Sequence, residues 1–261
     1  MKAWQIGLLL FFFSGTTFAV MQQEEVSYKD GDVELKGYLF WDDAFTGKRP
    51  GVLVVHEWWG LNDYAKLRAE MLAEVGYVAL AADMYGGGRL TRDPGEAKEW
   101  KMQVSDDIEL WQRRVNVALK QLATHPNVES TKLVAVGYSF GGSSVMQLAY
   151  SGADVDGVVS FYGSLPPATP EQAAKIKARV LVAHGDADNF IPVERIQAFK
   201  KALSDAGVDW EMDIYGGARH GFSNPYADGY GIDGLAYEEL SDRRSWLRML
   251  AFFEELFEED L

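Results

Sequence analysis

The chain has 261 residues, which is enough for one large α/β domain or two small ones. Its formal net charge of −14 at pH 7 argues against nucleic acid or an anionic membrane surface as a partner, because both need a basic surface on the protein. The absence of cysteine excludes disulfides, thiolate metal ligands and a cysteine nucleophile.

The N-terminal segment, residues 1–19, has the layout of a signal peptide. Lys2 gives a positively charged start, residues 6–13 form an apolar run, and small residues lead to a cleavage point after Ala19. The apolar run is far shorter than the roughly 20 residues that span a bilayer, so an uncleaved anchor is the less favoured alternative. We therefore expect a periplasmic or secreted protein whose residues 20–261 form a single domain with no stable membrane span.

The rest of the chain alternates strand patterns with helix patterns. Residues 24–40 show alternating apolar positions broken at Asp30-Gly31, which predicts a pair of antiparallel edge strands. Further strands are expected at 51–55, 77–82, 133–136, 157–162, 180–183 and 210–215, and helices at about 63–75, 93–124 (as two helices), 141–150, 192–206 and 237–257. This alternation predicts an α/β fold, with a mostly parallel sheet, helices on both faces and functional residues at the ends of the strands.

The stretch Gly-Tyr-Ser-Phe-Gly at residues 137–141 fits the pattern G-x-S-x-G and lies between a predicted strand and a predicted helix. A sharp turn there would lift the Ser139 hydroxyl clear of the sheet. Gly137 and Gly141 are needed because a Cβ would clash where strand and helix crowd the turn. A glycine-rich loop with a capping serine is the alternative. We interpret Ser139 as a candidate nucleophile.

A serine hydroxyl needs a base within hydrogen-bond reach, and only His184 and His220 follow Ser139 in the chain. The order nucleophile, acid, histidine is the one that α/β-hydrolases use, and it selects His220 as the base. The stretch Gly-Asp-Ala-Asp-Asn-Phe-Ile-Pro resembles the hydrolase pattern G-x-x-D-x-x-[VI]-P. That pattern selects Asp188, rather than Asp186, as the acid that orients the histidine.

Acyl transfer also needs donors for the developing oxyanion. The first is expected to be the backbone N–H of Phe140, directly after the nucleophile. The second is expected from the loop after the strand at 51–55, where the N–H of Trp58 is the preferred donor and that of Trp59 the next.

The sequence resembles the dienelactone hydrolase family of the α/β-hydrolases over essentially the whole chain from about Glu24. The motifs that carry the resemblance are His-Glu-Trp-Trp-Gly (56–60), Ala-Asp-Met-Tyr-Gly (82–86), Gly-Tyr-Ser-Phe-Gly-Gly (137–142) and His-Gly-Asp-Ala-Asp (184–188). The resemblance implies an α/β-hydrolase fold and substrates that are lactones or small esters carrying a carboxylate. It also places an auxiliary glutamate, Glu57, beside the nucleophile, and a substrate-binding arginine near Arg89 or Arg92.

The best-known members of that family use cysteine where this chain has Ser139. A serine hydroxyl is several pKa units less acidic than a thiol, so a carboxylate such as Glu57 cannot ionise it and activation falls to His220. Glu57 then either influences catalysis from the resting site or is structural. Serine favours ordinary esters over dienelactone itself.

The sequence therefore predicts an exported serine hydrolase of carboxylic ester or lactone bonds that needs no metal or organic cofactor. Arg89, Trp59 and Tyr85 are candidate substrate contacts, with a solvated loop arginine and core aromatics as the alternatives. Acyl transfer or peptide hydrolysis on the same three residues, or a non-catalytic exported binding protein, are the competing hypotheses. Glu57 next to His56 does not form H-E-x-x-H, and nothing else has metal-ligand spacing.

Overall fold

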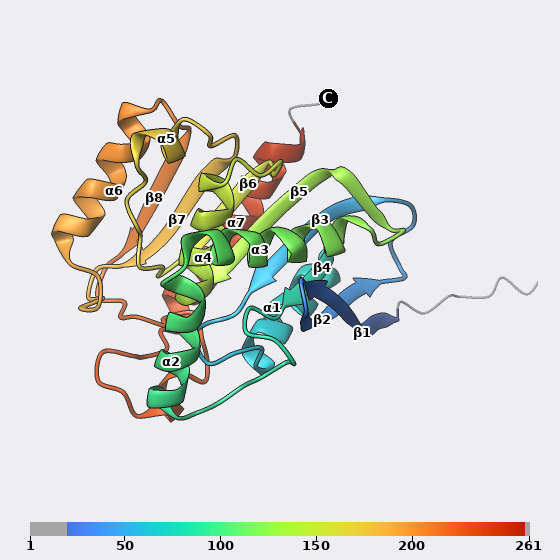
Figure 1. Cartoon of the computed structure of the whole chain (residues 1–261), viewed down its shortest axis with the longest axis horizontal. Coiled ribbons are helices and arrows are strands. Elements are labelled where there is room, and N and C mark those ends of the chain that lie inside the picture. The colour runs from blue at the N-terminus through green and yellow to red at the C-terminus, as the bar shows by residue number, and fades with distance from the viewer. Residues whose placement is uncertain (1–19, 259–261) are drawn as a thin grey trace, which may run out of the picture.

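The computed structural model describes residues 20–258 (Figure 1), so the predicted signal peptide at residues 1–19 lies outside the described part of the chain. The strands are β1 (Met21–Asp30), β2 (Val33–Asp42), β3 (Arg49–Val55), β4 (Val78–Ala82), β5 (Val128–Tyr138), β6 (Gly157–Phe161), β7 (Arg179–Gly185) and β8 (Trp210–Tyr215). The helices are α1 (Asp63–Glu74), α2 (Pro94–Ser105), α3 (Ile108–Ala123), α4 (Phe140–Tyr150), α5 (Pro170–Ala173), α6 (Val193–Asp205), the 3₁₀ turn η1 (Ala227–Tyr230) and α7 (Glu239–Glu258).

The strands form one eight-stranded sheet in the order β1-β2-β4-β3-β5-β6-β7-β8. β1 and β2 are antiparallel to each other and β2 is antiparallel to β4, while the pairings from β4 to β8 are parallel. The predicted α/β-hydrolase fold, with its antiparallel edge pair and parallel centre, is confirmed.

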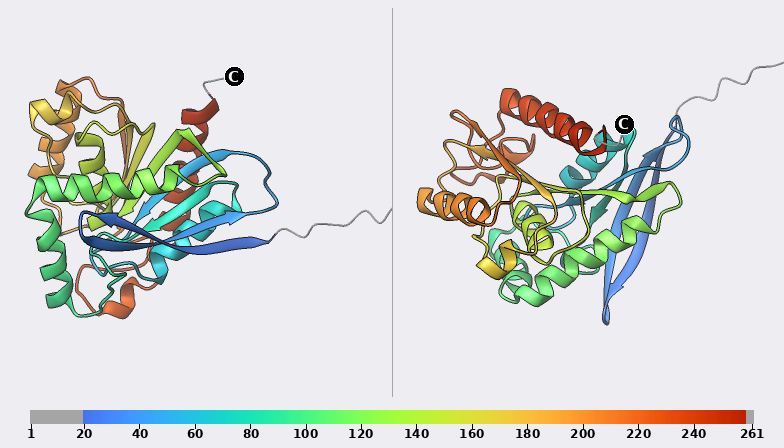
Figure 2. Two further views of the ribbon diagram at one scale, coloured as in Figure 1. Left: turned by 45° about the vertical axis from the view of Figure 1, so that its right-hand side comes forward. Right: turned by 90° about the horizontal axis from the view of Figure 1, so that it is seen from above.

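Helices cover both faces of the sheet. Helices α1 and α7 pack on one face, and α3, α4 and α6 pack on the other (Figure 2). The central strand β5 shows why a continuous apolar run predicts a strand that is covered on both faces. Leu133 and Ala135 face the core under α3 and α4, while Val134 and Val136 face the core under α1 and α7.

Polar residues define where the helices start. The side chains of Asn62, Asp93 and Asp107 each accept a backbone N–H in the first turn of the helix that follows, and Pro94 occupies the first position of α2. Such a cap stabilises a helix by about 1 kcal/mol because it satisfies a donor that has no partner inside the helix. These caps fix where α1, α2 and α3 begin.

The central strand β5 is longer than predicted. It begins at Val128, and its first residues pair with Arg49 and Pro50 before the register shifts between Pro50 and Gly51. The polar stretch Glu-Ser-Thr-Lys at residues 129–132 hides this start in the sequence, because those residues lie beyond the buried part of the sheet. No helix within residues 20–258 is long and apolar enough to cross a membrane.

Candidate active site

Ser139 occupies the sharp turn between β5 and α4. Its backbone has φ 53° and ψ −110°, a conformation that residues with a side chain rarely adopt. Its N–H donates to the carbonyl of Phe161 at 2.9 Å, and its own carbonyl accepts the N–H of Ser143 at 3.1 Å. The surrounding hydrogen bonds therefore hold the nucleophile candidate in a strained turn at the end of the central strand.

Two glycines make this turn sterically possible. A Cβ on Gly137 would lie 2.0 Å from the carbonyl oxygen of Gly141, and a Cβ on Gly141 would lie 2.1 Å from the carbonyl oxygen of Val55. Both contacts are with backbone, which cannot move aside. The motif predicted glycine on both sides of Ser139, and these two steric clashes explain why.

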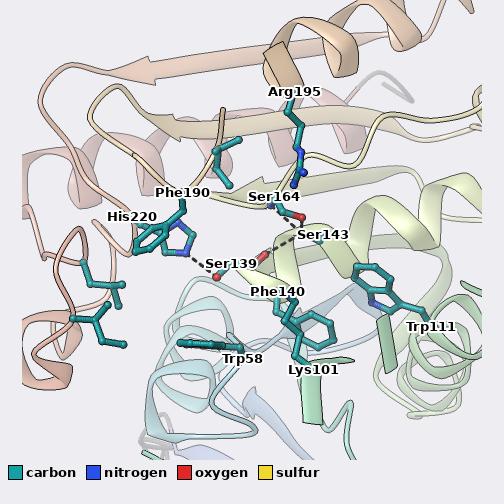
Figure 3. A pocket seen from close by; sticks show the side chains of 13 residues that line it. Trp58, Lys101, Trp111, Ser139, Phe140, Ser143, Ser164, Phe190, Arg195 and His220 are labelled. Carbon is teal, nitrogen blue, oxygen red and sulfur yellow. Dashed lines mark hydrogen bonds between the residues drawn. The ribbon is translucent and has the colours of Figure 1, made fainter. Parts of the chain in front are cut away.

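Three residues from distant segments form a continuous hydrogen-bonded chain (Figure 3 shows its Ser139–His220 part). Ser139 Oγ lies 2.8 Å from His220 Nε2, and His220 Nδ1 lies 2.8 Å from Asp188 Oδ2. A carboxylate only accepts hydrogen bonds, so the proton of the neutral imidazole belongs on Nδ1. Nε2 is then free to accept the proton of the Ser139 hydroxyl.

The acid and the base are both fixed by their loops. The Asp188 carboxylate is buried, and its second oxygen accepts the N–H of Phe190 at 3.0 Å. The His220 ring lies between the rings of Tyr162 and Phe190, whose centroids are each 5.1 Å away. The imidazole therefore has little freedom to leave the line between serine and carboxylate.

The two predicted oxyanion donors lie beside Ser139. Phe140 is the first residue of α4, where backbone N–H groups have no intrahelical acceptor. Trp58 lies in the loop after β3 and lines the same cavity as Ser139 and Phe140 (Figure 3). Both residues therefore line the cavity beside Ser139, and their role as oxyanion donors stays a prediction.

Glu57 is buried next to the catalytic candidates but bonds to other groups. Its carboxylate accepts Nδ2 of Asn224 at 2.7 Å and the hydroxyl of Tyr162 at 3.3 Å. Burial raises the pKa of Glu57 to about 7, against the opposing effects of His220 and Asn224. The sequence did not indicate Asn224 or Tyr162 as partners of Glu57, because an amide four residues after a histidine and a tyrosine at a strand end carry no specific signal.

A cavity of about 320 Å³ opens next to Ser139 and His220. Its walls are mostly apolar or aromatic, formed by Trp58, Trp111, Phe140, Phe190, Ile191, Ile232 and Leu235. Ser143 and Ser164 add hydroxyl groups, and Lys101 and Arg195 are its charged lining residues apart from His220. No acidic residue in the described part of the chain lines this cavity, although the protein as a whole carries a net charge of −14.

Among residues 20–258, no group of three or more His, Asp or Glu side chains is arranged to hold a metal ion. His56, which precedes Glu57 in the loop after β3, has both ring nitrogens bonded to backbone groups. Nδ1 contacts the carbonyl of Glu57 at 2.5 Å, and Nε2 accepts the N–H of Met84 at 3.2 Å.

A sequence model of the dienelactone hydrolase family matches residues 35–257. The chain belongs to the dienelactone hydrolase family. A solved dienelactone hydrolase-like promiscuous phosphotriesterase from metagenomic libraries is similar, with 38% sequence identity and a TM-score of 0.88 over 90% of this chain and 98% of that chain. A Yersinia pestis protein provisionally named carboxymethylenebutenolidase is 28% identical over 231 residues, 84% of this chain and 83% of the relative.

A Bradyrhizobium protein provisionally named 2-oxo-3-(5-oxofuran-2-ylidene)propanoate lactonase is 29% identical over 220 residues, 79% of this chain and 84% of the relative. The family expected from the sequence is therefore confirmed, and the chain is a hydrolase.

In this member of the dienelactone hydrolase family, the three predicted substrate contacts lie off the cavity. The Arg89 guanidinium bonds to the carbonyl of Tyr85 at 2.5 Å and lies over the ring of Trp100. Trp59 is buried and stacks on Tyr230 at 4.1 Å. Tyr85 is buried as well, so none of the three side chains is a wall of the cavity beside Ser139.

The cationic residues that do line the cavity, Lys101 and Arg195, come from helices α2 and α6. Burial lowers the pKa of Lys101, and the positive charge of Arg195 adds to the effect. Sequence reasoning missed both because it searched the segments directly after strands. A charged residue inside a helix gives no sign of which cavity its side chain reaches.

Proposed function

We propose that this dienelactone hydrolase family member is an exported serine hydrolase that cleaves carboxylic ester or lactone bonds through an acyl-enzyme on Ser139. The observation that carries the proposal is the unbroken chain from the Ser139 hydroxyl through His220 to Asp188, with both links at 2.8 Å. A binding protein has no need of this arrangement at the floor of its pocket.

The geometry supports an acyl-transfer mechanism in two halves. Ser139 Oγ attacks the substrate carbonyl carbon while His220 Nε2 takes the hydroxyl proton, and Asp188 stabilises the resulting imidazolium. The negative charge on the former carbonyl oxygen is met by the N–H groups of Phe140 and Trp58. As the carbon–oxygen bond breaks, Nε2 returns the proton to the leaving alkoxide.

Water completes the reaction. It enters where the alcohol left, gives a proton to His220 Nε2 and attacks the acyl carbon. Collapse of this second tetrahedral species breaks the bond to Ser139 Oγ, which regains the proton from His220. For a lactone substrate, the alcohol and acyl parts stay joined, and the product is a single hydroxy acid.

The cavity suggests the kind of ester. Aromatic and aliphatic walls favour an apolar body next to the scissile bond, while Lys101 and Arg195 favour an anionic substituent. The name of the Bradyrhizobium relative describes a lactone that carries a propanoate group, which agrees with an anionic substrate. We therefore expect anionic esters or lactones to be better substrates than neutral ones of the same shape.

The nucleophile is tested by labelling with a fluorophosphonate. The parent protein should react, and Ser139→Ala should not. Turnover of a panel of p-nitrophenyl esters and simple lactones should be lost in the same variant. Labelling that survives in Ser139→Ala would overturn the assignment of the nucleophile. Labelling without turnover of any ester or lactone would favour a binding or acyltransferase role, and addition of a competing alcohol or a peptide substrate would then separate transfer from peptide hydrolysis.

The anionic preference is tested by Lys101→Met. For an anionic ester KM should rise about tenfold, equivalent to one lost charge interaction of roughly 1.4 kcal/mol, while a neutral ester of the same size should be unaffected. Lys98→Met is the matched control, because Lys98 lies one turn earlier on α2 and lines a different surface. Equal effects of Lys101→Met on both esters would remove the charge argument. Export is tested separately, by N-terminal sequencing of the protein recovered from a periplasmic fraction, where the chain should begin at Val20.

A further inference from the structure

Trp58, the proposed oxyanion donor from the β3–α1 loop, is held on both sides by side chains that take no part in the proposed proton relay. His56 Nδ1 bonds to the carbonyl oxygen of Glu57, the group that precedes the Trp58 nitrogen in the same peptide. The hydroxyl of Tyr85 donates to the carbonyl oxygen of Trp58 itself at 3.0 Å. The peptide planes before and after Trp58 are therefore both fixed.

The first of these bonds sets the direction of the Trp58 N–H. In a trans peptide the carbonyl and the N–H of one plane point in opposite directions. Because His56 holds the Glu57 carbonyl on one side, the Trp58 N–H must point to the other side of the loop. The bond from Tyr85 to the next carbonyl keeps the residue from rotating about its own backbone angles.

His56 and Tyr85 are themselves rigidly supported. His56 is fully buried, and its Nε2 accepts the N–H of Met84 in the loop after β4. The buried Asp83 carboxylate accepts the N–H groups of Tyr85 at 2.7 Å and Gly86 at 2.9 Å. The loop after β4 thus acts as the fixed base from which the loop after β3 is aligned.

The same cluster reaches the other proposed donor. The Tyr85 ring packs edge-on against His56 at 5.0 Å and stacks on the ring of Phe140 at 5.6 Å, and Trp111 stacks on Phe140 at 5.5 Å. The backbone N–H of Phe140 is the other proposed oxyanion donor. One packed group of rings therefore connects the two amides that must converge on a single oxygen atom.

We infer that His56 and Tyr85 are positioning residues that aim the N–H of Trp58, together with that of Phe140, at the oxyanion of the tetrahedral intermediate. This inference rests on the proposed acyl-enzyme function. It gives Tyr85 a role different from the substrate contact expected from the sequence, since its side chain is buried away from the cavity.

Tyr85→Phe is the main test, because it keeps the ring packing and removes only the hydrogen bond to Trp58. We expect kcat to fall about tenfold with KM little changed, since a misaligned donor weakens the transition state more than the bound substrate. Tyr150→Phe is the matched control. Tyr150 is also a buried tyrosine whose hydroxyl donates to a backbone carbonyl, that of Pro166 at 2.6 Å, but it does not line the cavity.

His56→Leu and His56→Asn extend the test. Leucine removes the bond to the Glu57 carbonyl and should lower kcat by roughly 10²-fold, whereas asparagine can still donate from a similar position and should restore part of the loss. The readout specific to oxyanion alignment is inhibition by an arylboronic acid, which forms a tetrahedral adduct on the serine. Its Ki should rise in proportion to the fall in kcat/KM across Tyr85→Phe, His56→Leu and His56→Asn.

The inference is overturned if Tyr85→Phe behaves like Tyr150→Phe, or if Ki for the boronic acid stays constant while kcat falls. Should His56→Leu fail to fold, Tyr85→Phe alone decides. The two levels of proposal separate cleanly. Loss of activity in Ser139→Ala with normal activity in Tyr85→Phe and the His56 variants would leave the acyl-enzyme function in place and remove only the positioning roles. Activity that persists in Ser139→Ala would instead remove the function on which the inference rests.

Discussion

His56 and His220 have the same ring, but their hydrogen-bond partners differ in kind. Both nitrogens of His56 bond to peptide groups, the carbonyl of Glu57 and the N–H of Met84. Both nitrogens of His220 bond to side chains, the hydroxyl of Ser139 and the carboxylate of Asp188. Peptide groups do not exchange protons during a reaction, whereas a hydroxyl that becomes an ester oxygen must give its proton away.

Solvent access separates the two histidines in the same sense. His56 is completely buried, and burial lowers its pKa so that the ring stays neutral. The His220 side chain keeps 12% of its surface exposed, toward the cavity where substrate and water arrive. What a histidine in a hydrolase touches thus decides whether it takes part in the reaction or supports the structure. The variants that follow test the His220 side of that contrast, and the His56 variants test the other.

The largest effect is expected from removing the base or its serine partner. His220→Ala and Ser139→Ala should each lower kcat by roughly 10⁵–10⁶-fold, because serine and base act as one unit. Hydrolysis assays with a p-nitrophenyl ester measure the fall in kcat, and circular dichroism checks that the variants fold. His125→Ala is the control variant: the His125 ring packs at a tilt against Trp41 and does not line the cavity, so the activity of this variant should match that of the parent. Substantial hydrolysis by His220→Ala would contradict the role given to that residue.

A somewhat smaller loss is expected from Asp188→Asn. The amide can donate to His220 Nδ1, which selects the tautomer with its proton on Nε2 and so prevents that nitrogen from accepting the Ser139 proton. We expect kcat to fall by about 10⁴-fold while KM changes little. Burst-phase kinetics should show slower acylation. A variant that acylates at the parent rate would mean that Asp188 does not orient the base.

Glu57→Gln tests the second carboxylate near His220, which influences the ring by charge without bonding to it. Burial raises the pKa of Glu57 to about 7, so this carboxyl ionises within the working pH range, and Glu57→Gln should remove the contribution of that ionisation to the kcat/KM profile near pH 7. The change in kcat itself should stay within about tenfold. An unchanged profile would show that ionisation of Glu57 does not affect catalysis.

The same variant has a stability signature. Folding raises the pKa of Glu57 from an ordinary 4.5 to about 7, so the folded state binds the proton more tightly and loses stability as pH rises between those values. Above pH 7 the cost is about 3 kcal/mol, and Glu57→Gln should relieve it. Urea unfolding of parent and variant at pH 4.5 and pH 8 measures this. The variant's advantage should appear only at the higher pH, and a constant difference would show that the carboxyl is not the cause.

Much of this arrangement was predictable from sequence because strand ends do the positioning. Ser139, Asp188 and His220 each come directly after or shortly beyond a strand of a parallel sheet, and such strand ends share one edge. The order of the three residues then restricted their roles. The folding of the sheet itself follows from the apolar runs in β3, β4, β5 and β6, which are buried on both faces.

The wall of the cavity was not predictable for a different physical reason. The glycines at 86, 87 and 88 all have positive φ and turn the chain back, so that Arg89 bonds to the carbonyl of Tyr85 instead of reaching the cavity. Lys101 and Arg195 arrive from two helices, and where their side chains end depends on how those helices sit over the sheet. Local residue patterns predict neither the direction in which a loop turns nor the position of a helix over the sheet.

The backbone conformation of Ser139 also affects the thermal stability of the protein. A backbone with positive φ suits glycine better than any residue with a Cβ. Ser139→Gly should therefore have a free energy of unfolding about 1 kcal/mol larger than that of Ser139→Ala, and a higher unfolding temperature, although both variants lack the nucleophile. Differential scanning calorimetry of the pair would show it. In related chains that no longer hydrolyse their substrate, stability would not favour serine at this position. A glycine there would therefore indicate that hydrolase activity has been lost.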